Sequence, residues 1–388
     1  MKVLITGAGI TGNALAFWLS KIGHGVTIIE QFPPSAMRCM GLEQVFRAKL
    51  APEQGLQVVD KSGRRRAYFP ANKSSKGLQN FTIEFEIMRG DLCRLIYDAT
   101  KDRAKYIFGA SVESFEEKEN SVEGSRIRKM MFESRIADAA YHPLKGVNMA
   151  YFTICQPIRE GEEYIATAYM APGKRVIMTR RHSPHEIQVY LGCTTNSERL
   201  KNARQEGDVG EQKADWEEVF QGAGWQTEGI FKSLMGGNTD FYDECPAMVK
   251  LESWSRGRVT LIGDAAYCPT ATTGLGTTCA IIGAYVLAGE IGRPSRRSNG
   301  EDVDRRDDAK YGPATALEAY QRKFQPFIDQ VQKGVSVSED TGFLDMLTSS
   351  PSGIAILNNL LYSRHPRPDD SIQPFDQQDR NSSWQGLA

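Results

Sequence analysis

The chain has 388 residues, enough for a large core and for two domains or one large domain with a subdomain, so a small secreted module is excluded. Lys and Arg (47) nearly balance Asp and Glu (48), so no overall field would draw the protein to nucleic acid or to an anionic membrane. A small neutral or weakly charged ligand is expected instead. The seven cysteines form no CxxC pair, which disfavours a disulfide framework or a metal site and suits a reducing compartment.

The first thirty residues predict a βαβ unit. Residues 3–5 form a short apolar run typical of a buried parallel strand, and apolar residues then recur at helical spacing over 13–22. A second apolar strand, 26–29, ends at Glu30. Glycines interrupt the apolar stretch 3–19, so we interpret it as strand, turn and helix rather than as a signal peptide. Nothing later approaches a membrane span free of charge, and we expect a soluble, cytoplasmic protein.

The middle of the chain alternates between helical and β-rich patterns. Helices are predicted at 40–46 and 89–99, and strands at 57–60 and 66–69 predict a hairpin. Further β-rich segments separated by turns indicate an antiparallel sheet that forms one wall of a second compartment, at 149–154, 164–170, 175–179 and 187–191.

The C-terminal half begins with an acidic, amide-rich stretch, 196–215, which predicts a solvated connection. Helices are predicted at 216–223, 228–235 and 278–291, and a buried strand at 258–262. The dense charges of 293–308 predict a mobile loop, and the Pro-, Asp- and Gln-rich residues from 364 onward predict a disordered tail.

A glycine-rich motif, GAGITG (7–12), joins the first predicted strand to the first helix and matches the GxGxxG pattern of a dinucleotide site. Gly7 permits a tight turn, Gly9 lets a pyrophosphate approach the backbone, and Gly12 lets helix and strand pack closely. Glu30 ends the second strand, where a carboxylate accepts from ribose hydroxyls. A carboxylate there, rather than Arg, favours FAD or NAD over a 2′-phosphorylated nucleotide. The alternative is a glycine-rich turn without a ligand.

A second motif lies far downstream, in GRVTLIGDAAY (257–267). A predicted strand ends at Gly263 and presents Asp264 from its carboxyl end, where ligands lie in open α/β sheets. Asp264 could accept from a ribityl hydroxyl, and backbone N–H groups at 276–278 could stabilise negative charge on a reduced flavin ring. Alone, Asp264 would be interpreted as a helix cap. Together with a dinucleotide motif at the start of the chain, it favours a ligand site.

With these motifs the sequence resembles the class A flavoprotein monooxygenases of the aromatic-hydroxylase fold, in particular the branch with tetracycline-inactivating oxygenases and specialised-metabolism hydroxylases. The resemblance covers most of the chain from Met1 to about Phe327. It rests on GAGITG with Glu30, on EIMRGDL (86–92), on the segment GRVTLIGDAAYCPTATTGLGTTCAIIGAYVLAGEI (257–291), and on YQR (320–322) with the Pro-Phe pair at 326–327.

The resemblance implies an α/β fold with a Rossmann-like FAD-binding domain, an antiparallel substrate domain and C-terminal helices. We assign 1–60, 86–140 and 250–292 to the FAD-binding domain, 61–85 and 141–249 to the substrate domain, 293–312 to the mobile loop, 313–362 to the helices and 363–388 to the tail.

The resemblance also implies the cofactor site. Glu30 would hold the adenosine ribose, Arg89 the flavin side near the pyrophosphate, and Asp264 the ribityl chain or pyrophosphate. Without the family pattern, Arg89 would be read as a surface ion pair. The full set of expected FAD-binding residues is Gly7, Gly9, Ile10, Thr11, Gly12, Glu30, Gln31, Arg38, Arg89, Asp264, Pro269, Gly274, Gly276 and Thr277. No metal site and no catalytic base are predicted.

Two stretches depart from the family pattern. Arg38 runs straight into Cys39 and Met40, where the family has a Gly-rich loop, a strand and the start of a helix. After Asn120, a core parallel strand and a Gly-Ala-Asp-Gly loop are absent, and only Gly124 and Arg128 of that motif remain. Three explanations stay open: a trimmed member that still binds FAD, a flavin-fold protein with a non-redox role such as cyclisation or small-molecule binding, or a shortened, inactive form.

The activity implied by the family is insertion of one oxygen atom from O2 into an apolar aromatic or polyketide- or terpenoid-like molecule, with FAD as cofactor and NADPH or NADH as co-substrate. Tyr151, His182, His185 and Tyr190 are candidates for the substrate-facing wall, although each also suits an ordinary strand residue. An NAD-dependent dehydrogenase is disfavoured because the downstream motif has no role in one. A monomer and a weak dimer are equally compatible with the charge balance.

Overall fold

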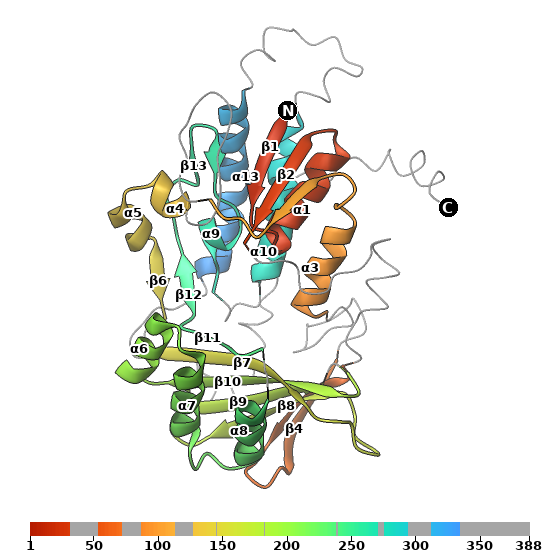
Figure 1. Cartoon of the computed structure of the whole chain (residues 1–388), viewed down its shortest axis with the longest axis vertical. Coiled ribbons are helices and arrows are strands. Elements are labelled where there is room, and N and C mark those ends of the chain that lie inside the picture. The colour runs from red at the N-terminus through yellow and green to blue at the C-terminus, as the bar shows by residue number, and fades with distance from the viewer. Residues whose placement is uncertain are drawn as a thin grey trace.

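Two lobes make up the part of the chain that the computed structural model describes, one above the other in Figure 1. The described residues are 1–31, 53–71, 87–112, 127–144, 146–181, 183–237, 240–270, 275–293 and 312–333. The predicted helix at 40–46, the stretch 294–311 and everything after 333 lie outside these ranges. No helix within them is long and apolar enough to cross a membrane.

The first lobe begins with the predicted βαβ unit. Its elements are β1 (Lys2–Thr6), α1 (Ile10–Lys21), β2 (Gly25–Glu30), α3 (Arg89–Asp98) and β5 (Lys105–Phe108). The three strands form a parallel sheet in the order β1-β2-β5. Ile5, Val26 and Ile28 of this sheet are buried, as expected for parallel strands with cover on both faces. The α/β class and the unit predicted from the first thirty residues are therefore confirmed.

The rest of the first lobe comes from distant parts of the chain. It consists of α4 (Ile127–Met131), α5 (Ser134–Ala139), β6 (Tyr141–Pro143), β12 (Ala247–Val249), β13 (Ser255–Arg256), β14 (Val259–Thr260), α9 (Asp264–Tyr267), α10 (Gly276–Ile291) and α13 (Pro313–Lys333). The predicted strand at 258–262 is shorter than expected. Only the two residues of β14 form ladder bonds, and they pair with β13 rather than with the parallel sheet. Among the described strands, β1 therefore has a neighbour on one side only.

An aromatic cluster ties α13 to the segment that follows β14. Trp254 and Tyr267 lie 4.6 Å apart between ring centroids, and the Tyr320 hydroxyl donates to that of Tyr267 at 2.9 Å. Phe324 completes the cluster. A Cβ on Gly283 of α10 would overlap the Tyr267 hydroxyl, so this glycine lets α10 pack directly against the cluster. The cluster fixes the position of Gly263 and Asp264 relative to α10.

The second lobe is built on a seven-stranded sheet in the order β11-β7-β10-β9-β8-β3-β4. Its strands are β3 (Gly55–Val59), β4 (Arg65–Pro70), β7 (Val147–Cys155), β8 (Ile165–Ala171), β9 (Arg175–Arg181), β10 (Glu186–Thr194) and β11 (Tyr242–Glu244). The hairpin of β3 and β4 and the antiparallel run β8-β9-β10 are as predicted. Because β3 also pairs with β8, residues 55–59 belong to this sheet, and the boundary that we placed at residue 60 is wrong.

Helices α6 (Glu198–Glu206), α7 (Val209–Phe220) and α8 (Thr227–Gly236) cover one face of this sheet (Figure 1). The prediction of a solvated connection over 196–215 is wrong, since α6 and half of α7 lie there. Ser197 and Asp208 cap the two helix starts with their side-chain oxygens, and Gly207 between them takes a left-handed conformation at φ 75°. Of the α6 side chains that the structure describes, Leu200 and Ala203 join the buried core.

Candidate functional site

The glycine loop between β1 and α1 has the geometry that a dinucleotide motif requires. Gly7 has a φ of 96°, and its N–H donates to the Ile29 carbonyl at 2.8 Å, which closes the loop onto β2. A Cβ on Gly12 would overlap the Gly7 carbonyl oxygen, so only glycine lets the helix approach so closely. A Cβ on Gly9 would meet no atom within 4 Å, so the space in front of the loop is open.

The first turn of α1 offers backbone donors to that open space. The first helical bond of the turn runs from the Asn13 N–H to the Gly9 carbonyl at 3.0 Å. The N–H groups of Ile10, Thr11 and Gly12 precede it and have no acceptor within the helix. Together with the positive end of the helix dipole, they suit a phosphate group.

Glu30 reaches the same loop from the end of β2. Its Oε2 accepts from the Ala8 N–H at 2.7 Å. Asn13, which is completely buried, donates to the Ala8 carbonyl and accepts from the Tyr106 hydroxyl at 2.7 Å. Neither Ala8 nor Asn13 was predicted as part of the site. The only signal in the sequence is an amide among the apolar residues that begin α1.

Arg89 starts α3 near the same end of the loop. Burial raises the pKa of the Cys93 thiol, the charge of Glu30 adds to the rise, and the charge of Arg89 opposes it. Both charged groups therefore lie close to Cys93, whose thiol donates to the Ala8 carbonyl at 3.2 Å. The structure therefore places both Glu30 and Arg89 near Cys93, beside the glycine loop.

The downstream motif meets the glycine loop directly. Gly263 has a φ of 65°, and a Cβ there would overlap the Thr11 hydroxyl. The next residue, Asp264, is exposed at the start of α9. Burial raises the pKa values of Cys268 and Cys279 to about 12, and the nearby Asp264 carboxylate contributes to both shifts. Asp264 therefore lies near the first turn of α10.

Helices α1 and α10 run side by side in the same direction. The Trp18 ring lies 5.1 Å from the Tyr285 ring, and a Cβ on Gly292 would lie 2.6 Å from the Ile22 side chain. Contacts thus follow the same order along both helices, and their N-termini lie at the same end. The first bond of α10 runs from the Cys279 N–H to the Leu275 carbonyl, so the N–H groups at 276–278 are also free of helical acceptors.

The remaining predicted site residues are placed as follows. Gln31 is exposed directly after β2, and Pro269 is buried two residues after the end of α9. Gly276 and Thr277 form the first turn of α10. Arg38 and Gly274 lie outside the described residues. The structure thus gathers the predicted residues that it describes around two helix N-termini, with Asp264 beside one and Glu30 beside the other.

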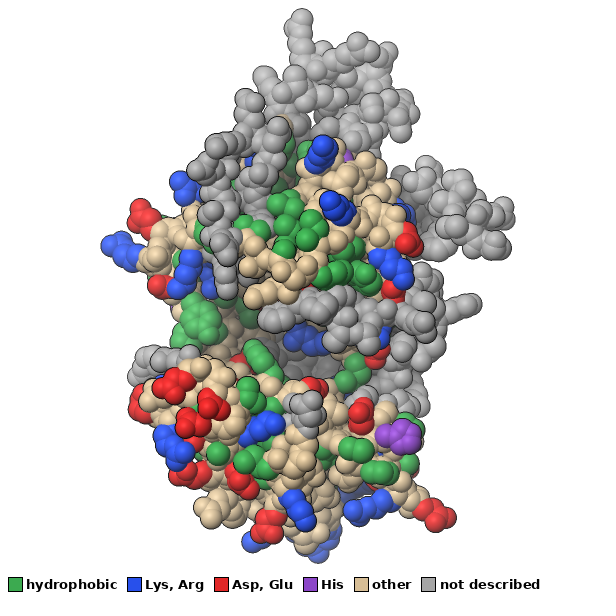
Figure 2. Space-filling view, in the orientation of Figure 1, with side chains coloured by type: hydrophobic (Ala, Val, Ile, Leu, Met, Phe, Trp, Pro, Cys, Tyr) green, Lys and Arg blue, Asp and Glu red, His purple; other side chains and the backbone are tan. Residues whose placement is uncertain are grey.

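Among the described residues, no helix packs on the face of the second-lobe sheet opposite α6, α7 and α8. Tyr151 of β7 and Tyr190 of β10 are register partners on this face, and their rings meet edge to face at 5.6 Å. His185 does not lie there, because it occupies the exposed turn between β9 and β10, and His182 lies outside the described residues. A hollow separates the two lobes, with hydrophobic side chains along its edges (Figure 2).

Comparison with known proteins agrees with this site. No family model matches the sequence. The FAD-dependent monooxygenase asL4 of Sarocladium schorii is 43% identical over 397 positions, which cover 92% of this chain and 91% of the relative. The flavin-dependent monooxygenase eupH of a Phoma species is 36% identical, with 84% of each chain covered.

Solved structures show the same fold. Tetracycline destructase Tet(51) superposes with a TM-score of 0.69 at 24% identity, over 92% of this chain and 95% of the other. Klebsiella pneumoniae HpxO, complexed with FAD and uric acid, gives a TM-score of 0.61 at 17% identity, over 93% of this chain and 92% of the other.

The fold and the paired helix N-termini define a dinucleotide-binding α/β protein of the aromatic-hydroxylase type. The identity to asL4 and eupH over most of the chain places it in a particular family. The chain belongs to the FAD-dependent monooxygenases, which are oxidoreductases.

The alignment with asL4 also bears on the two departures noted in the sequence. Its 397 positions exceed the 388 residues of the whole chain, although only 92% of the chain is aligned. The relative therefore carries residues that have no counterpart here.

Proposed function

We propose that this monooxygenase binds FAD across the paired N-termini of α1 and α10. The observation that carries the proposal is the contact of Gly263 with Thr11, because it joins the two motifs into one cradle. The open space at Gly9 and the first-turn N–H groups of both helices, which have no acceptor within the helix, suit the pyrophosphate and the anionic part of a flavin.

Individual residues then take separate roles in holding the cofactor. Glu30 accepts from the adenosine ribose, and Arg89 neutralises phosphate charge near the loop. Asp264 accepts from the ribityl chain, while the N–H groups of Gly276 and Thr277 stabilise negative charge on the ring. When bound, FAD supplies the redox and oxygen chemistry that protein side chains lack.

We propose further that NADPH or NADH reduces the cofactor and that the substrate is an apolar aromatic or polyketide- or terpenoid-like molecule. The aromatic face with Tyr151 and Tyr190 supports this substrate class, because aromatic rings pack edge to face or offset against one another. Side chains there would orient the substrate and exclude water.

Two observations favour a second candidate, a shortened form that holds FAD weakly or not at all. The relative asL4 has residues that are absent here, and β1 has only one described neighbour in a sheet whose first strand carries the glycine loop. An unpaired edge would leave backbone groups beside the loop without partners.

A turnover assay distinguishes the two proposed functions. Purified chain supplied with FAD, NADPH or NADH, and air should oxidise the nicotinamide faster when a suitable aromatic compound is added. The product should gain the mass of one oxygen atom, and the same mixture under argon should give none. Nicotinamide oxidation that no aromatic compound accelerates, with no oxygenated product, would favour the shortened-form candidate.

A further inference from the structure

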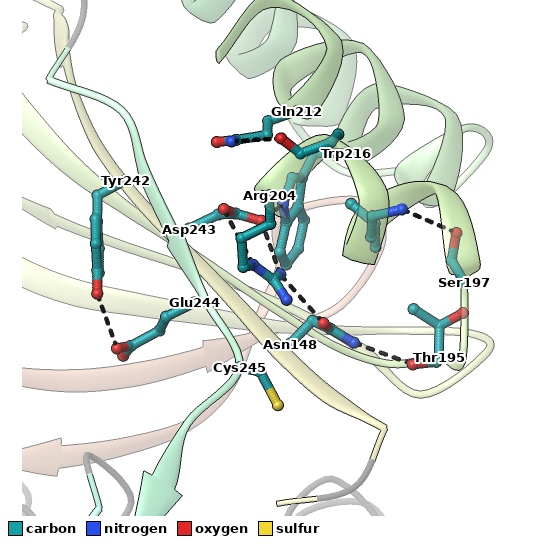
Figure 3. Close-up of polar contacts among 12 residues, drawn as sticks. Asn148, Thr195, Ser197, Arg204, Gln212, Trp216, Tyr242, Asp243, Glu244 and Cys245 are labelled. Carbon is teal, nitrogen blue, oxygen red and sulfur yellow. Dashed lines mark hydrogen bonds and ion pairs between the residues drawn. The ribbon is translucent and has the colours of Figure 1, made fainter. Parts of the chain in front are cut away.

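The side chains of the edge strand β11 alternate between the two faces of the sheet. Asp243 points toward the covering helices, where it accepts from Trp216 Nε1 at 3.1 Å (Figure 3). Because side chains alternate along a strand, Tyr242 and Glu244 lie on the opposite face, the one that also carries Tyr151 and Tyr190. Nothing in the cofactor cradle uses these two residues.

Glu244 joins two tyrosines on that face. Its Oε1 accepts from the Tyr151 hydroxyl at 3.0 Å, and its Oε2 accepts from the Tyr242 hydroxyl at 3.2 Å. The Tyr151 and Tyr242 rings stack with 6.2 Å between centroids. Burial, with the Glu244 charge next, raises the pKa of Tyr242 to about 12 and that of Tyr151 further, so both phenols remain donors at neutral pH.

This group lies at the junction of the lobes, near the segment that presents Asp264. The Glu244 charge contributes, after burial, to the raised pKa values of Tyr141 in β6 and of Cys268 just after α9. Tyr242 is 56% exposed and Tyr141 is 45% exposed. Two open aromatic rings therefore flank a half-buried carboxylate between the substrate face and the proposed flavin site.

We propose that Glu244 is a positioning residue that binds a phenolic or enolic hydroxyl of a neutral substrate. The inference rests on the proposed function and names the substrate group that this face recognises. An ionised carboxylate only accepts, and it offers about four lone-pair sites, of which Tyr151 and Tyr242 take two. The remaining sites suit a hydroxyl donor, whereas a methyl ether offers no proton and a carboxylate substrate would be repelled.

The test compares olivetol, which carries two phenolic hydroxyls, with its dimethyl ether, which carries none, by calorimetry on the purified chain. Olivetol should bind at least about tenfold more tightly than the ether, the usual size of a hydrogen bond to a charged group. Glu244→Gln should bring this ratio close to one, because the amide is a weaker acceptor. Glu217→Gln, an exposed position on α7, is the matched control and should leave the ratio unchanged.

Tyr242→Phe provides a second variant at an exposed position, should Glu244→Gln fold poorly. It frees one carboxylate oxygen from its partner and should change the ratio without loss of the folded state. The proposal is overturned by equal affinity for the two probes, by no measurable binding of olivetol, or by an unchanged ratio in both variants. Calorimetric binding needs no turnover, so its failure is distinct from failure to oxidise a substrate.

Discussion

At the glycine loop, adding a single methyl group to Gly12 or to Gly9 distinguishes a glycine that the fold requires from one that the cofactor requires. Gly12 faces the Gly7 carbonyl with no room for a side chain, whereas Gly9 faces open space. The two positions therefore test different properties of the same motif.

Gly12→Ala should lower the free energy of unfolding by about 3 kcal/mol, because α1 must shift away from a backbone atom that cannot yield. Gly9→Ala should change it by less than about 1 kcal/mol, since the new methyl group meets nothing and affects only the helix cap. It should still weaken FAD binding, because the methyl group occupies the approach of the pyrophosphate. Urea denaturation and flavin titration measure the two effects. Equal losses of stability at both positions would contradict this assignment.

Sequence spacing was sufficient to predict the tight turn at Gly7, the close packing at Gly12 and the place of Glu30 at the end of β2, since these depend on local backbone geometry. It was not sufficient for Asn13. The partners of Asn13 include Tyr106, which is far away in sequence, and an amide in a helix is equally compatible with a solvent-facing position. Glu244 was not predicted either, because one of its two partners, Tyr151 of β7, is also far away in sequence.

At the scale of elements, a buried ion pair holds α6 and α7 to the edge of the substrate sheet. Arg204 donates to Asp243 at 2.8 Å and to Asn148 at 3.2 Å, and Trp216 shares the same carboxylate (Figure 3). The Asp243 side chain is 1% exposed. This network also fixes β11, and with it the position of Glu244.

Asp243→Ala should lower the free energy of unfolding by about 3–5 kcal/mol, because it leaves Arg204 without its buried partner. Asp138→Ala is the matched control. The ion pair of Asp138 with Lys129 is 62% exposed on both sides, so its loss should cost less than about 1 kcal/mol. Chemical denaturation of both variants gives the comparison, and similar stability of the two would show that the network does not anchor the helices.

Element boundaries could be predicted where apolar residues recur with a clear period. The prediction failed where charged residues obscure that period. The charged surface of α6 concealed a helix whose caps, Ser197 and Gly207, were visible in the sequence. The segment 258–262 has the composition of a buried strand, but ladder bonds also require a neighbouring strand. A single sequence does not reveal that, among the described strands, β14 has only β13 beside it.

For the whole molecule, two motifs more than two hundred residues apart were enough to predict the fold, because both belong to one cofactor cradle. The close approach of Gly263 to Thr11 shows that the two motifs lie together, as expected. The domain boundary at residue 60 was misplaced, since the pairing of β3 with β8 joins residues 55–59 to a strand from the other half of the substrate domain. Pairing between distant strands is a property of the assembled sheet rather than of either segment.

The visible absorbance spectrum of the purified chain, before and after incubation with FAD and gel filtration, tests the cradle most directly. We predict the bands of a protein-bound flavin at about one FAD per folded chain, in keeping with one dinucleotide motif per chain. A folded protein that stays colourless after incubation with FAD would contradict the proposal that the N-termini of α1 and α10 hold the cofactor.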